Sequence, residues 1–135
     1  MSPDFQPIPG AEGWQLSNPP ILALAPLRAS MDIFSEAGID RLRQKSLLLT
    51  GYMEFLLRET ASGKFSIITP TDPERRGAQL SIRLANGHAV CTKLTANGLI
   101  GDWREPDIYR IAPVPLYNSF RDVYGFVQRF SAALS

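Results

Sequence analysis

The chain has 135 residues, of which 44% are hydrophobic, and its 14 basic and 13 acidic residues leave a net charge of +1. This length is sufficient for one globular domain with a buried core. The near-balance of charge gives no field that would favour a nucleic acid or an anionic membrane surface, so we expect neither partner. The longest apolar stretch, residues 21–26, is also far shorter than the roughly 20 residues that a membrane-spanning helix needs.

A single cysteine, Cys91, excludes an internal disulfide and leaves too few thiols for a structural zinc site. We interpret Cys91 as a half-buried small apolar residue. The N-terminal segment has prolines where a signal peptide would carry a basic patch and an apolar run. We therefore expect a soluble, cytoplasmic protein.

The beginning of the chain, residues 1–16, contains three prolines and no apolar periodicity, so we expect an irregular lead-in segment. Residues 17–135 are predicted to form the folded domain. Helical order should begin at residues 17–20, Ser-Asn-Pro-Pro, where a polar capping side chain precedes two prolines that suit a first helical turn. Pro26 then predicts a kink or a break in the apolar run that follows.

A second helix is predicted from Ile39 to about Thr60. Its apolar residues fall on one stripe and charged residues lie opposite, which is typical of an amphipathic helix. The residues of this stripe are Leu42, Leu49, Met53 and Leu56.

Four short strands and one short helix are predicted in the middle of the chain. Alternation of apolar and polar residues is typical of a half-buried strand, and residues 79–84 place Leu80, Ile82 and Leu84 on one side. The predicted segments are strands at 65–69, 79–84, 99–104 and 108–112 and a helix at 88–97, closed by Gly98.

A loop rich in prolines and charges is predicted at residues 70–77. It carries the pair Arg75-Arg76, which could be mistaken for a phosphate site but lacks the glycine-rich loop and helix start that such a site uses. We expect both arginines to be exposed.

The last helix is predicted to follow Ser119, whose side chain can cap it, with Asp122 in the first turn. The connections between strands are not the regular helical crossovers that a doubly wound parallel sheet requires. We therefore expect an α+β fold, with a mostly antiparallel sheet of about four short strands and helices packed on one face.

Arg110 stands inside an otherwise apolar predicted strand. A guanidinium is costly to bury without a partner, and its planar fork matches a carboxylate in a two-point contact. One strand face would carry Arg110, and the other Tyr109 and Ile111. Composition alone favours an ion pair with nearby Asp102 or Asp107, and an acid-bearing ligand is the alternative.

Three separated motifs occur along the chain: Trp-Gln-Leu-Ser-Asn-Pro-Pro at 14–20, Lys-Ser-Leu-Leu-Leu-Thr-Gly-Tyr at 45–52, and a stretch at 107–120 that contains Ala-Pro-Val-Pro-Leu-Tyr-Asn. Together they resemble the C-terminal part of the kynureninases. This family consists of pyridoxal-phosphate enzymes of tryptophan catabolism and NAD biosynthesis, which hydrolyse kynurenine to anthranilate and alanine. The resemblance implies the small domain of a fold-type I enzyme and a homodimer.

The resemblance also implies site residues. In kynureninases the arginine at the position of Arg110 anchors the α-carboxylate of the substrate, which orients the substrate without transferring a proton. Asn18, and with it Ser17, would lie beside the aromatic end of the substrate. A simple helix cap is the alternative for both. The family's cofactor lysine lies upstream, in the large domain, and its motif is matched by none of the three lysines here: Lys45, Lys64 and Lys93.

We therefore predict the substrate-binding C-terminal domain of a kynureninase-like hydrolase, with pyridoxal phosphate held by an upstream large domain. The chain alone is predicted to bind no cofactor and to have no hydrolase activity. A stand-alone binding or interaction module derived from this domain is the alternative. The motifs speak against a cysteine desulfurase or an aminotransferase as the parent. Separated from its large domain, the chain should expose an apolar face and self-associate.

Overall fold

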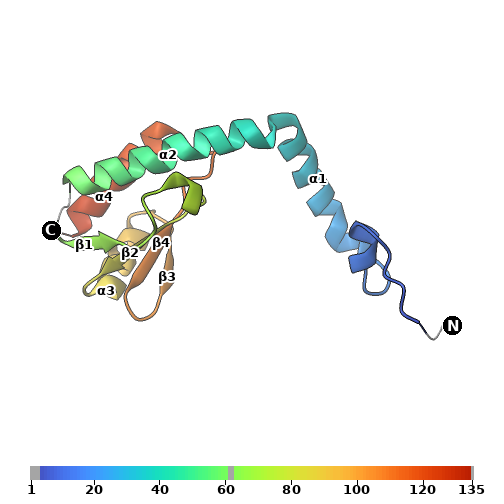
Figure 1. Cartoon of the computed structure of the whole chain (residues 1–135). Coiled ribbons are helices and arrows are strands. Elements are labelled where there is room, and N and C mark those ends of the chain that lie inside the picture. Colours follow the sequence, from blue (N-terminus) through green and yellow to red (C-terminus); the bar gives the residue numbers. More distant parts are fainter. Residues whose placement is uncertain (1–3, 61–62, 135) are drawn as a thin grey trace. The chain divides into compact units, whose positions relative to one another are not determined.

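The computed structural model describes residues 4–60 and 63–134 (Figure 1). By its internal contacts the chain divides into two compact units, Met1–Gly38 and Ile39–Ser135. We refer to them as the first and the second unit.

The first unit contains a short 3-10 helix, η1 (Ala11–Trp14), and the helix α1 (Ile21–Ala37). α1 runs through Pro26 without interruption, so the predicted break is wrong. A proline removes only one backbone donor, and the neighbouring leucines and alanines are strong helix formers that compensate for that loss. α1 ends before Gly38, whose φ of 80° is the positive value that glycine adopts without strain.

The second unit begins with the long helix α2 (Ile39–Thr60), whose bounds confirm the predicted helix. Its apolar stripe faces inward, because the predicted Leu42, Leu49 and Met53 are buried together with Leu57, while Leu56 is half-buried. Polar residues of α2 are buried as well: Ser46, Thr50 and Glu54.

Four short strands form one antiparallel sheet in the order β1-β2-β4-β3, which confirms the predicted sheet. β3 is shorter than predicted because the preceding helix ends only at Ala96, and the N–H of Leu99 still donates back to the carbonyl of Leu94 at 3.0 Å, which closes the end of that helix. The strands are β1 (Phe65–Ile67), β2 (Leu80–Leu84), β3 (Asp102–Arg104) and β4 (Ile108–Ile111).

The core lies between one face of this sheet and the helices α2, α3 (Gly87–Ala96) and α4 (Phe120–Ala133). Figure 1 shows α2 and α4 side by side, and they make the most extensive contact between helices of this unit. Such short strands are marginal alone, whereas each fully buried aliphatic or aromatic side chain contributes about 1.5–3 kcal/mol. The core residues include Leu49, Met53, Leu57, Leu80, Ile82, Leu84, Leu94, Tyr109, Ile111, Val123, Val127 and Phe130.

In the part of the chain that the structure describes, nothing indicates a membrane-spanning helix or a metal site. No helix there is long and apolar enough to cross a bilayer. No three side chains of histidine, cysteine, aspartate or glutamate gather there where they could hold a metal ion. Cys91 is half-buried, as expected for a small apolar residue.

Candidate functional site

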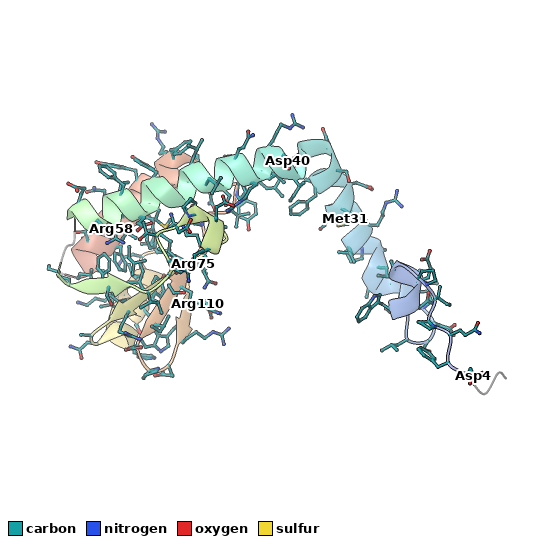
Figure 2. All side chains as sticks on the ribbon, viewed as in Figure 1. Asp4, Met31, Asp40, Arg58, Arg75 and Arg110 are labelled. Atoms are coloured by element: carbon teal, nitrogen blue, oxygen red, sulfur yellow. The ribbon has the colours of Figure 1, made fainter. Side chains whose placement is uncertain are left out.

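The sheet has an outer face, opposite to the core, and Arg110 lies on it (Figure 2). Side chains alternate along β4, so Tyr109 and Ile111 point into the core while Arg110 points away from it. Its register partners are Ser81 on β2 and Asp102 on β3. The predicted division of the strand into two faces is thus confirmed.

Asp102 accepts hydrogen bonds from the Arg110 guanidinium. Nε of Arg110 donates to Oδ2 of Asp102 at 2.6 Å, and Nη2 donates to the same oxygen. Nε of Arg104 also donates to this oxygen, at 3.0 Å. Of the two aspartates considered from the sequence, Asp102 is therefore the partner of Arg110, and Asp107 instead pairs with Arg83 at 3.1 Å.

This ion pair leaves the guanidinium accessible from outside the domain. The exposed fraction of the side chain is 31% for Arg110 and 48% for Asp102. Within residues 4–60 and 63–134, no acceptor is recorded for Nη1 of Arg110. The ion pairs on the outer face join three arginines to two aspartates, so one positive charge is in excess. A ligand-binding role for Arg110 stays a prediction.

Ser17 and Asn18 lie in the first unit, between η1 and α1. The residue that caps α1 is Pro20, and no side chain makes a capping hydrogen bond, so the cap interpretation of these two residues is wrong. The two prolines separate Asn18 from the first free N–H groups of the helix. Ser17 has a φ of 83°, which is uncommon outside glycine, and its carbonyl accepts from Nε2 of Gln15 at 3.0 Å. Substrate contacts of Ser17 and Asn18 stay predictions.

A buried ion pair between α2 and the 70–77 loop was not predicted from the sequence. The Glu54 and Arg76 side chains are only 7% and 5% exposed, and Nη1 of Arg76 donates to Glu54. Arg58 donates to the other carboxylate oxygen at 2.7 Å, and Thr71 does so at 3.1 Å. Burial raises the pKa of Glu54, but the hydrogen bonds from Arg76, Arg58 and Thr71 outweigh it, so that the pKa is lowered.

The prediction that Arg76 is exposed is therefore wrong, because the loop folds back onto α2 and places this side chain in the interior. The loop also contains a short 3-10 helix, η2 (Pro73–Arg75). One signal could have revealed the site. Glu54 falls on the buried stripe of α2, next to Met53 and Leu57, where a carboxylate requires a partner.

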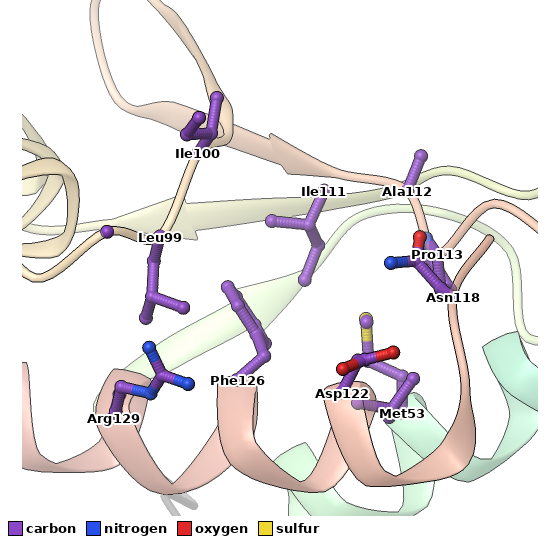
Figure 3. A pocket seen from close by; sticks show the side chains of 12 residues that line it. Met53, Leu99, Ile100, Ile111, Ala112, Pro113, Asn118, Asp122, Phe126 and Arg129 are labelled. Carbon is purple, nitrogen blue, oxygen red and sulfur yellow. The ribbon is translucent and has the colours of Figure 1, made fainter.

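A cavity of about 290 Å³ opens between α4 and the end of β4 (Figure 3). Its polar rim is engaged in local structure, because Asp122 accepts from Ser119 at 2.7 Å and Oδ1 of Asn118 accepts from the N–H of Val114 at 2.7 Å. Arg110 is not among its lining residues, so the cavity is separate from the outer-face site. Side chains that line it include Leu99, Ile111, Pro113, Asp122, Phe126 and Arg129.

Comparison with known proteins decides the family. Residues 42–130 match the family model of the kynureninase C-terminal domain. The chain belongs to this family. The matched range extends from α2 into α4 and therefore contains Arg110 and its partner Asp102, while Ser17 and Asn18 precede it. The resemblance noted in the three sequence motifs is confirmed.

Whole-length relatives extend the match to the first unit. The kynureninase of Koribacter versatilis is 65% identical over 136 residues, which cover 100% of this chain and 32% of that protein. The kynureninase of Stenotrophomonas maltophilia is 56% identical over 98% of this chain and 32% of its own length. That of Xanthomonas campestris is 54% identical over 95% and 31%, respectively. The chain thus spans about a third of the length of these curated relatives.

Proposed function

We propose that this chain is the substrate-binding C-terminal domain of a kynureninase-like hydrolase that converts kynurenine to anthranilate and alanine. The observation that carries the proposal is the accessible guanidinium of Arg110, on an outer face whose ion pairs join three arginines to two aspartates. Arg110 would bind the α-carboxylate of the amino acid and fix its orientation, with no proton transferred. Asn18 and Ser17 would contact the polar substituents at the aromatic end.

Pyridoxal phosphate does not fit the lysines of this chain. Pyridoxal phosphate is an aldehyde, and it needs the amine of a lysine to which it can bind covalently. However, Nζ of Lys45 donates to the carbonyl of Pro115 at 2.7 Å, and Nζ of Lys64 donates to that of Leu134 at 3.3 Å. Lys93 lies exposed in the last turn of α3. We therefore propose that the cofactor and its lysine belong to a large domain of the parent enzyme, which we expect to be a homodimer.

Binding of L-kynurenine to the full chain tests the role of Arg110. Arg110→Ala should weaken binding by about ten- to a hundredfold, since hydrogen bonds to charged groups contribute roughly 1.5–3 kcal/mol. Arg83→Ala is the matched control, because it removes another exposed arginine from the outer face. Kynuramine, which lacks the α-carboxylate, should be insensitive to Arg110→Ala. Equal binding of kynurenine to the wild type and to Arg110→Ala would contradict the assignment.

A hybrid enzyme tests whether this chain supports kynureninase activity. The matching segment of the Koribacter versatilis kynureninase is replaced by this chain, and release of anthranilate from kynurenine is measured. The hybrid should be active, and Arg110→Ala should lower its kcat/KM by about a hundredfold. The isolated chain with added cofactor should release no anthranilate above a blank without protein. A folded hybrid without activity, together with kynurenine binding by the isolated chain, would favour the stand-alone binding module.

A further inference from the structure

The hydrogen bonds of Arg110 determine which part of its guanidinium a ligand can reach. A guanidinium offers a side edge, formed by Nε and one terminal nitrogen, and an end edge, formed by both terminal nitrogens. Nε and Nη2 of Arg110 both donate to Oδ2 of Asp102, so the side edge is occupied. The end edge, which includes Nη1, has the geometry for a two-point contact with a second carboxylate.

We propose that Asp102 is a positioning residue, which holds the side edge of Arg110 and thereby presents its end edge to the carboxylate of the ligand. The inference rests on the proposed function of Arg110. Asp102 is well suited to this role because it lies directly opposite Arg110 in the register of β3 and β4. A carboxylate on a paired strand orders the long arginine side chain before the ligand arrives, which lowers the entropy that binding must overcome.

The opposite role for Asp102 is that of a competitor, whose negative charge repels an acidic ligand. Two observations favour positioning. Oδ2 of Asp102 also accepts from Nε of Arg104 at 3.0 Å, so its charge is shared between two guanidinium groups. With Asp102 present, the ion pairs of the outer face still join three arginines to two aspartates. The two roles predict opposite effects on affinity when the side chain is removed, so a binding experiment distinguishes them.

Binding of L-kynurenine to the full chain provides the first test. Asp102→Ala should weaken binding by about three- to tenfold, which corresponds to the cost of ordering one long side chain at 1.4 kcal/mol per tenfold. Asp102→Asn should bind within about threefold of the wild type, since its amide oxygen can accept the same two hydrogen bonds. Asp107→Ala makes the same change of charge on the outer face but removes the partner of Arg83, so it should not weaken binding. Binding by Asp102→Ala that equals or exceeds that of the wild type overturns the proposal.

A second measurement needs no ligand. In the ¹⁵N-labelled chain, nuclear relaxation of the Arg110 Nε–Hε group should report a rigid side chain in the wild type and in Asp107→Ala, and a mobile one in Asp102→Ala. A side chain that stays rigid in Asp102→Ala overturns the proposal. If Arg110→Ala binds kynurenine as tightly as the wild type, the proposed function fails, while relaxation still decides whether Asp102 positions Arg110. The two failures are therefore distinguishable.

Discussion

Two arginines of the second unit, Arg76 and Arg110, differ in burial, and this difference separates a structural role from a ligand-binding role. Arg76 is 5% exposed, and its guanidinium donates to Glu54 inside the domain. Arg110 is 31% exposed and is held by Asp102 along one edge only. Removing one member of a buried pair leaves an uncompensated charge, whereas a surface pair contributes about 0–1 kcal/mol. We therefore expect Arg76 to control stability and Arg110 to remain available to a ligand.

Glu54→Gln should destabilise the domain by about 3 kcal/mol at neutral pH, because it leaves the buried Arg76 without its counter-charge. Urea unfolding of the full chain measures this. Glu59→Gln is the matched control, since Glu59 is an exposed glutamate of the same helix and should change the free energy of unfolding by less than about 0.5 kcal/mol.

The same carboxylate predicts a pH dependence. The pKa of Glu54 in the folded protein is lowered from its ordinary value of 4.5, so the unfolded chain takes up a proton at a higher pH than the folded protein does. The stabilisation is fully present above the unfolded pKa and is lost as the pH falls through the folded pKa. The difference in unfolding free energy between the wild type and Glu54→Gln should thus shrink as the pH is lowered below 4.5. A difference that stays constant with pH would show that the charge of Glu54 does not stabilise the fold.

At the scale of elements, α4 begins where local chemistry predicts. The N–H of Ser119 donates to Oδ2 of Asp122 at 2.7 Å, and the N–H of Asp122 donates to Oγ of Ser119 at 3.3 Å, which forms a reciprocal capping box. The N–H and the hydroxyl of Ser119 both donate to Oδ2 of Asp122, and these two hydrogen bonds lower the pKa of Asp122. Both partners are close in sequence, so the pattern of residues is sufficient to identify the helix start.

Ser119→Ala should therefore lower the free energy of unfolding by about 1 kcal/mol, as is typical for the loss of an N-cap hydroxyl. Ser66→Ala makes the same chemical change at an exposed position of β1 and should cost less than about 0.5 kcal/mol. Urea unfolding of both variants at neutral pH decides the matter. Equal stabilities of the two variants would mean that the capping box contributes nothing measurable.

The parts of the site that sequence could not predict depend on pairing between distant elements. The alternation within β4 placed Arg110 correctly, but the choice between Asp102 and Asp107 depends on the register of β3 and β4, which is set by the turn between them. The Glu54–Arg76 pair joins residues 22 positions apart, and it exists only because the 70–77 loop folds back onto α2. Helices and strands are encoded by local periodicity, whereas these contacts are created by tertiary structure.

At the scale of the whole molecule, the two units differ in how much they bury. Every residue of the core cluster lies in the second unit, and α1 has no buried residue. Large apolar side chains of the first unit are exposed, and such surfaces are typical of protein interfaces. In the parent enzyme we expect the large domain or the second subunit to cover them. The most exposed are Phe5, Trp14, Leu16, Ile21 and Leu22.

This division predicts that residues 39–135 fold without the first unit. Because the core cluster is complete within them, their urea unfolding should be cooperative, with a free energy within about 0.5 kcal/mol of that of the full chain.

Sedimentation should show concentration-dependent association of the full chain and a monomer for residues 39–135. The double variant Leu27→Ser and Met31→Ser removes two exposed apolar side chains from one face of α1 and should reduce association at unchanged stability. Association that persists without residues 1–38 would place the associating surface in the second unit. A large loss of unfolding free energy in residues 39–135, relative to the full chain, would show that the first unit contributes to the core of the second.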